Sequence, residues 1–86
     1  MPHHRDHLEP LDDGFVAFYT KSGERWKHRD VEGGTTGLGY RLFVSESGAE
    51  RRHIFGPKEP HDATLLDLRE QVSRATPVEA PARPAT

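Results

Sequence analysis

The chain contains the same sequence unit twice. Residues 14–28, GFVAFYTKSGERWKH, align without gaps on residues 39–53, GYRLFVSESGAERRH, at an offset of 25. Self-similarity of this kind marks one supersecondary unit that is used twice. Each copy has a β-rich run, a Ser-Gly turn and a returning strand, which predicts two similar β-hairpins. The identical positions are Gly14 and Gly39, Phe18 and Phe43, Ser22 and Ser47, Gly23 and Gly48, and His28 and His53.

The register of the first hairpin depends on the geometry of its Ser22-Gly23 turn. A two-residue loop pairs Tyr19 with Trp26. A type I turn with Gly23 in the left-handed region, followed by a bulge, pairs Phe18 with Trp26 instead. Because a shift of one residue sends a side chain to the opposite face of the sheet, the two registers predict different cores. The sequence leaves both open.

A helical periodicity follows the second copy. Leu65, Leu68 and Val72 recur at the spacing of one helix face, which predicts an amphipathic helix from about residue 63 to residue 75. Its N-terminus can be capped by Asp62 or Thr64. A helix of this length is marginal in isolation, so we expect its leucine stripe to pack on the sheet.

About four strands followed by one helix predict an α+β domain. The simplest form is a small antiparallel sheet of two similar hairpins with the C-terminal helix packed across its core face. A strongly bent half-barrel, in which the hairpins fold over each other, is the competing arrangement.

The predicted helix has signals at both ends. Thr64 with Asp67 approximates a capping box at its start, and Thr76-Pro77 ends it.

The period of two in a strand divides each copy into two faces. One face carries Phe15, Ala17, Tyr19, Tyr40, Leu42 and Val44, and we predict that it is the core face. Phe18 and Phe43 fall on the opposite face at the same position of the repeat. Two equivalent apolar residues indicate that this second face is also covered, by the other hairpin, a tail or a partner subunit.

The length of 86 residues allows one small domain, which we place at residues 13–76. Residues 1–12 are polar and are expected to form a loose tail, and the Pro/Ala-rich residues 77–86 are expected to be disordered. The chain has no cysteine, no apolar signal segment at its N-terminus and no apolar run long enough to cross a bilayer. We therefore expect a soluble, cytoplasmic protein without a membrane partner.

Basic residues gather in the predicted sheet. Residues 14–58 contain eight lysines or arginines against five acids, although the whole chain has a net charge of −2. Cations beside an aromatic ring are typical of proteins that bind single-stranded nucleic acid. This alternative hypothesis, less favoured because the chain is acidic overall, assigns binding to Arg25, Trp26, Lys27, Arg29, Arg51 and Arg52.

The favoured hypothesis is a small non-enzymatic interaction module with a protein partner or a second copy of itself. Its candidate surface is the second sheet face, where Phe18 and Phe43 lie near Arg41 and Arg52. Aromatic residues with arginines have the character of a recognition patch or a homodimer seam. Catalysis is not expected, because the serines lie in turns or on the helix and no carboxylate pair or Ser/His/Asp spacing is present.

Metal and cofactor sites are also weakly indicated. His28 and His53 occupy equivalent positions, but a structural zinc site needs four ligands and only Asp30 and Glu32 are at hand to complete it. The N-terminal cluster of His3, His4 and His7 could bind copper(II) or nickel(II), and is better explained as a polar tail. The glycine-rich joint at residues 32–39 lacks the helix and lysine of a P-loop. We predict no cofactor and no metal.

Overall fold

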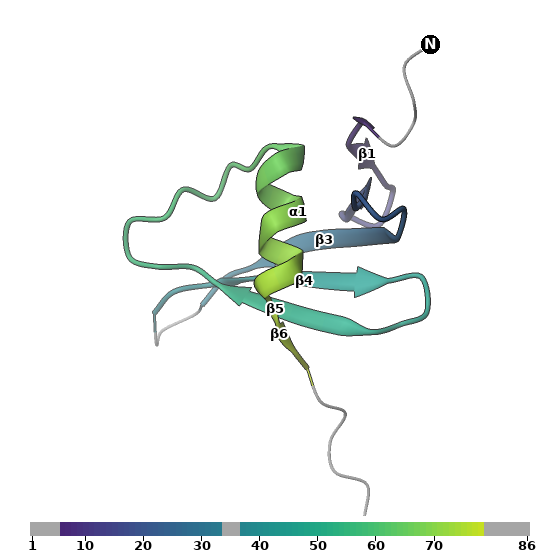
Figure 1. Cartoon of the computed structure of the whole chain (residues 1–86). Coiled ribbons are helices and arrows are strands. Elements are labelled where there is room, and N and C mark those ends of the chain that lie inside the picture. The colour runs from purple at the N-terminus through teal and green to yellow at the C-terminus, as the bar shows by residue number, and fades with distance from the viewer. Residues whose placement is uncertain (1–5, 34–36, 79–86) are drawn as a thin grey trace, which may run out of the picture.

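A single short helix packs on one face of an open antiparallel sheet in the computed structural model, which describes residues 6–33 and 37–78 (Figure 1). The predicted α+β class is confirmed. The strands are adjacent in chain order, so the sheet is a simple meander. The elements are β1 (Glu9–Pro10), β2 (Val16–Tyr19), β3 (Arg25–Val31), β4 (Tyr40–Ser45), β5 (Glu50–Ile54), α1 (Leu65–Arg74) and β6 (Thr76–Pro77).

The sheet has six strands, where the sequence predicted about four. The additional strands are the two edges, β1 and β6, and each consists of two residues of which one is a proline. Segments this short show no alternating pattern, so only pairing with a neighbouring strand identifies them. Proline has no N–H donor, and these edges therefore offer little to a further strand. Strand β1 belongs to the tail that was expected to be loose. Pro77 of β6 belongs to the tail that was expected to be disordered, and the next residue, Val78, donates its N–H to the Glu50 carbonyl at 2.9 Å. Residues 1–5 and 79–86 of the two tails lie outside the described part.

The turns after β2 and β4 have the same hydrogen bonds at an offset of 25 residues. The N–H of Gly23 donates to the Thr20 carbonyl at 3.0 Å, and the N–H of Gly48 donates to the Ser45 carbonyl at 3.0 Å. Both glycines have positive φ, 93° for Gly23 and 92° for Gly48, which is the left-handed region of the bulged type I turn. Phe18 therefore pairs with Trp26, the second of the two registers that the sequence left open.

The core lies between the sheet and the helix. Phe18, Trp26 and Phe43 contribute its rings, and the rings of Phe18 and Phe43 meet edge to face with their centroids 5.9 Å apart. The helix contributes Leu68 and Val72, which are almost completely buried as its leucine stripe predicted. Figure 1 shows the helix crossing the direction of β3, β4 and β5.

The predicted core face is the wrong one of the two. The helix covers the face with Phe18 and Phe43, whereas Phe15, Tyr40 and Leu42 lie on the opposite side and are only half-buried. The period of two separates the faces correctly but carries no information on which one the helix covers. The bulged turns decide this, because they place Trp26 beside Phe18 and so assemble the larger set of rings on one side.

The helix begins with the predicted capping box. The Asp67 N–H donates to the Thr64 hydroxyl at 3.2 Å, and the Thr64 N–H donates to the Asp67 carboxylate at 3.0 Å. The bond from the Thr64 N–H, together with one that the Thr64 hydroxyl donates to the same carboxylate at 3.0 Å, holds the pKa of Asp67 below its usual value. At the other end Ala75 is extended, and the chain continues directly into β6. Among the residues described here, no helix is long and apolar enough to cross a lipid bilayer.

Candidate interaction face of the sheet

Three of the predicted protein-binding residues are buried within the chain itself, so their assignment to a surface for a partner is wrong. Phe18 is 1% exposed and Phe43 is 0% exposed, because both lie beneath the helix. Arg41 is 1% exposed. The face that the sequence assigned to a partner is therefore covered by the C-terminal part of the same chain. Of the predicted protein-binding set, Arg52 alone is exposed.

Arg41 connects the sheet to the helix and to the loop before it. Its Nε and Nη2 atoms donate to the two carboxylate oxygens of Asp30 at 2.7 and 3.1 Å, and its Nη1 donates to the Gln71 side chain at 2.7 Å. Nη2 also donates to the carbonyl of His61. A buried guanidinium needs this many acceptors, because an unpaired charge in the core is strongly destabilising. Arg41 therefore has a structural role.

The predicted nucleic-acid-binding set is divided between the two faces. Trp26 is 4% exposed, and Arg51 lies 5.0 Å from its ring centroid and donates to the Val72 carbonyl at 2.8 Å. The tryptophan is therefore a core residue and not a platform for base stacking. The other four residues of the set lie together on the opposite side of the sheet, on β3 and β5: Arg25, Lys27, Arg29 and Arg52.

We call this opposite side the open face, because within the described residues no helix covers it. Antiparallel sheets commonly leave one face in water. The pairing places its side chains in rows across the strands. One row consists of Lys27, Val44 and Glu50, the next of Arg29, Leu42 and Arg52, and the last of Val31, Tyr40 and Ile54.

Two cations of the open face are paired with acids from the N-terminal segment. Arg25 lies 2.9 Å from Glu9, and Lys27 lies 3.5 Å from Asp13. A hydrogen bond from the Phe15 N–H, together with the Lys27 charge, holds the pKa of Asp13 below its usual value. Both acids are exposed, and the two pairs cancel most of the positive charge on this side of the face.

The other two cations, Arg29 and Arg52, stack on aromatic rings. The Arg29 guanidinium lies 5.4 Å from the Phe15 centroid, and that of Arg52 lies 4.6 Å from the Tyr40 centroid. Both arginines are exposed, and neither has an acidic partner in residues 6–33 and 37–78. Among the described residues, the open face therefore holds two guanidinium groups without a carboxylate partner, one on each side of Leu42.

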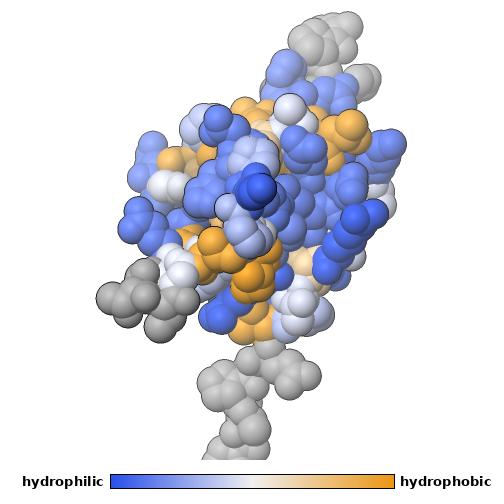
Figure 2. Space-filling model, turned by 90° about the vertical axis from the view of Figure 1, so that its left-hand side faces the viewer, coloured by the Kyte–Doolittle hydropathy of each residue, from blue (hydrophilic) through white to orange (hydrophobic). Residues whose placement is uncertain are grey.

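One end of the open face is apolar. Ile54 is 60% exposed, and it lies in one row with Tyr40 and Val31. Leu38, just before β4, is 52% exposed. Figure 2 views the molecule from the side on which β3 ends and β4 begins, and it shows a hydrophobic area next to hydrophilic side chains. The other end is hollowed by about 290 Å³ over Ala17 and Val44.

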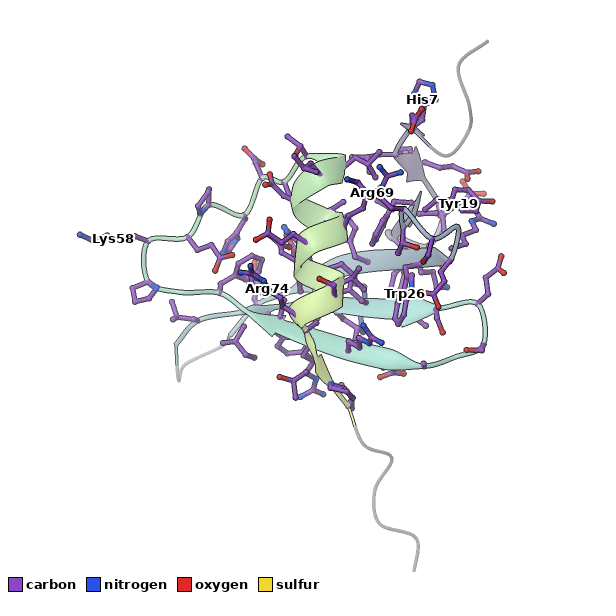
Figure 3. The ribbon with its side chains drawn as sticks, in the orientation of Figure 1. His7, Tyr19, Trp26, Lys58, Arg69 and Arg74 are labelled. Carbon is purple, nitrogen blue, oxygen red and sulfur yellow. The ribbon has the colours of Figure 1, made fainter. Side chains whose placement is uncertain are left out.

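A second groove, of about 430 Å³, lies on the covered side, between the helix and the β2–β3 turn. Trp26 and Val72 line it, and Leu66 stands at its edge and is 64% exposed. Arg69 crosses beside it from the helix and donates to the Tyr19 carbonyl at 2.7 Å (Figure 3). The arginine thereby joins α1 to β2. We therefore interpret this groove as part of the packing between the helix and the sheet.

The two equivalent histidines occupy separate environments. The His28 ring packs beside the rings of both Phe18 and Phe43, and burial, with the Arg41 charge, lowers its pKa from 6.5 to about 4. The Nε2 atom of His53 is hydrogen-bonded to the carboxylate of Glu59 at 2.6 Å. The described residues contain no group of three or more His, Asp or Glu side chains that could hold a metal ion. His3 and His4 of the N-terminal cluster lie outside those residues.

No model of a known protein family, no curated protein and no solved structure matches this chain. Its function is therefore inferred from its own geometry.

Proposed function

We propose that this protein is a small non-enzymatic interaction module that binds a protein partner through the open face of its sheet. The single observation that carries the proposal is the exposed combination of Ile54 and Leu38 with the stacked arginines Arg29 and Arg52. Exposed apolar residues next to aromatic rings and arginines are the composition of interface centres. The binding residues are thus Arg29 and Arg52 with the apolar end, in place of Phe18 and Phe43.

A different protein is favoured over a second copy of this chain. In a twofold dimer each surface faces an equivalent surface. Two apposed open faces would bring four arginines without acidic partners close together, since each copy contributes Arg29 and Arg52. Juxtaposed like charges in an interface cost several kcal/mol. A partner with a different charge pattern avoids this cost.

Site-specific photo-crosslinking tests the proposal. A benzoylphenylalanine at position 42, in the centre of the open face, is expected to give a discrete adduct with another protein in the cells that make this one. The same group at position 66, on the exposed side of the helix, is the matched control and should not give that adduct. The adduct should disappear in Ile54→Asp.

Two results contradict the proposal. The first is the absence of any adduct from position 42, and the second is the same adduct from positions 42 and 66. An adduct of twice the protein's own mass would replace the foreign partner with a second copy.

Single-stranded nucleic acid is the second candidate ligand. The observation in its favour is that Arg25, Lys27, Arg29 and Arg52 share one face with Phe15 and Tyr40. Fluorescence anisotropy of a labelled oligonucleotide at several salt concentrations tests it, because neutralised phosphates give a steep salt dependence. An anisotropy that does not change up to millimolar protein removes this candidate.

A further inference from the structure

The centre of the open face carries two arginines in one row across the sheet. Arg29 of β3 and Arg52 of β5 are both register partners of Leu42 on β4, so the three residues form one row across three adjacent strands. Neighbouring strands are about 4.8 Å apart, which puts the two arginine Cα atoms about 10 Å from each other. The Arg29 guanidinium lies over Phe15, on the β2 side of this row, and that of Arg52 lies over Tyr40, so the two arginines offer their donors on either side of Leu42.

The way these arginines are held leaves their donors available. Each guanidinium lies over a ring, Arg29 over Phe15 and Arg52 over Tyr40, and in residues 6–33 and 37–78 no carboxylate binds its N–H groups. The N–H groups of a guanidinium point outward in its plane, where they match the two oxygens of a carboxylate. Stacking also restricts the side chain before any ligand arrives, which lowers the entropy cost of binding.

The neighbouring cations differ in this respect. Arg25 and Lys27 already have carboxylate partners, Glu9 and Asp13, which the chain supplies itself. These two pairs show that cations of this face bind carboxylates. Because Arg29 and Arg52 lie next to the row of Tyr40 and Ile54, a ligand that binds them carries apolar side chains next to its acid.

We infer that the partner presents an acidic, apolar segment, whose carboxylates are bound by Arg29 and Arg52 on either side of Leu42 and whose apolar side chain packs on Tyr40, Ile54 and Leu38. This inference rests on the proposed function and specifies the partner's chemistry. Nucleic acid fits the geometry less well, because the rings of Phe15 and Tyr40 are already covered by cations and two of the four cations are neutralised.

A library of random twelve-residue peptides displayed on phage and selected on the full chain tests the inference. We expect the enriched peptides to combine Asp or Glu with Leu, Ile, Phe or Trp. Synthetic copies should shift the amide NMR signals of Leu42 and Ile54. Arg29→Gln and Arg52→Gln should each weaken peptide binding about 5- to 10-fold, and the double variant at least 30-fold.

Matched variants separate a specific site from general attraction by charge. Lys58→Gln with Arg74→Gln removes two exposed cations from outside the open face (Figure 3), and it should change the affinity less than 2-fold. Arg29→Lys with Arg52→Lys keeps the charge but not the planar donors, and it should still weaken binding several-fold. Equal affinity of the lysine pair and the wild type overturns the proposed geometry.

The outcomes also separate this inference from the proposed function. Peptides that bind the open face but contain no acidic residue overturn the inference and leave the function standing. Failure to enrich any peptide that shifts the Leu42 and Ile54 signals overturns both. A labelled single-stranded oligonucleotide that binds more tightly than every enriched peptide, and depends on Arg29 and Arg52, replaces the protein partner with nucleic acid.

Discussion

The two faces of this sheet contain the same kinds of residue in opposite states. Each has aromatic rings and arginines, but Arg41 on the helix side is 1% exposed and fully engaged, whereas Arg29 and Arg52 on the other side are exposed and stacked on rings. The difference is the helix, which supplies Leu68 and Val72 to one face only. An aromatic-plus-arginine composition therefore marks both a core and a candidate interface, and burial decides between them.

The comparison is tested most severely at two neighbouring residues of β4. Phe43→Ala is expected to lower the free energy of unfolding by about 4 kcal/mol, because it leaves a cavity in the core. Leu42→Ala, one residue away on the open face, is the matched control and should cost about 1 kcal/mol. Urea denaturation followed by tryptophan fluorescence measures both values. Similar losses in the two variants would show that both faces are covered in the free protein.

A second pair compares arginines of the two faces. Arg41→Gln removes the charge that Asp30 and Gln71 surround, and should destabilise the protein by about 3 kcal/mol. Arg52→Gln should change the free energy of unfolding by about 0.5 kcal/mol or less, because the contact between Arg52 and the Tyr40 ring lies at the solvated surface. The two midpoints of urea denaturation give the comparison. A larger effect at Arg52 than at Arg41 would reverse the assignment of structural and binding roles.

The helix face also contains His28, a group whose titration makes the free energy of unfolding depend on pH. The pKa of His28 is about 4 in the folded protein and about 6.5 in an unfolded chain. Between these pH values the unfolded state binds more protons than the folded state. The contribution of His28 to the free energy of unfolding is therefore fully present above pH 6.5 and is lost as the pH falls towards 4. Because water partly screens the ring, we expect a loss of about 2 kcal/mol over this range.

His28→Gln removes this titration and so separates its effect from that of acids such as Asp13 and Glu59. Because the pKa values of these acids are lowered, their protonation destabilises the protein only at still lower pH. Denaturation at several pH values between 4 and 7 gives the two curves. The wild-type curve should fall more steeply than that of His28→Gln. Parallel curves would show that His28 is solvated.

The smallest expected effect is at the apolar end of the open face. Ile54→Ser should change the free energy of unfolding by less than about 0.5 kcal/mol, because a side chain that is 60% exposed has little packing to lose. Thermal denaturation measures it, with Val72→Ser as the buried control. A loss as large as that of the control would show that another part of the chain covers this end.

Local rules predicted the helix and the positions of the turns, although they left the geometry of the first turn open. The spacing of Leu68 and Val72 and the pair Thr64 and Asp67 are short-range features, and they identified the stripe and the capping box of α1. The repeated Ser-Gly turns have equal hydrogen bonds in both copies. The edge strands β1 and β6 escaped prediction because two residues with a proline have no strand signal of their own.

The candidate site was the least predictable part. Arg52 and the cations of β3 were identified from the sequence, but Phe18, Phe43 and Arg41 were assigned to a surface that the helix occupies. Alternation along a strand gives both faces similar apolar content here. The signal that could have helped is the size of the residues, because the face with Trp26 holds the larger rings.

The sequence by itself determined the elements that depend on neighbours along the chain: the duplicated strand-turn-strand unit, the capped helix and the α+β class. Only the tertiary structure decided which side of the sheet is core and which is exposed. The physical reason is that alternation fixes two faces without ranking them. The ranking comes from long-range packing, in which the bulged turns bring Trp26 beside Phe18 and the helix then buries both.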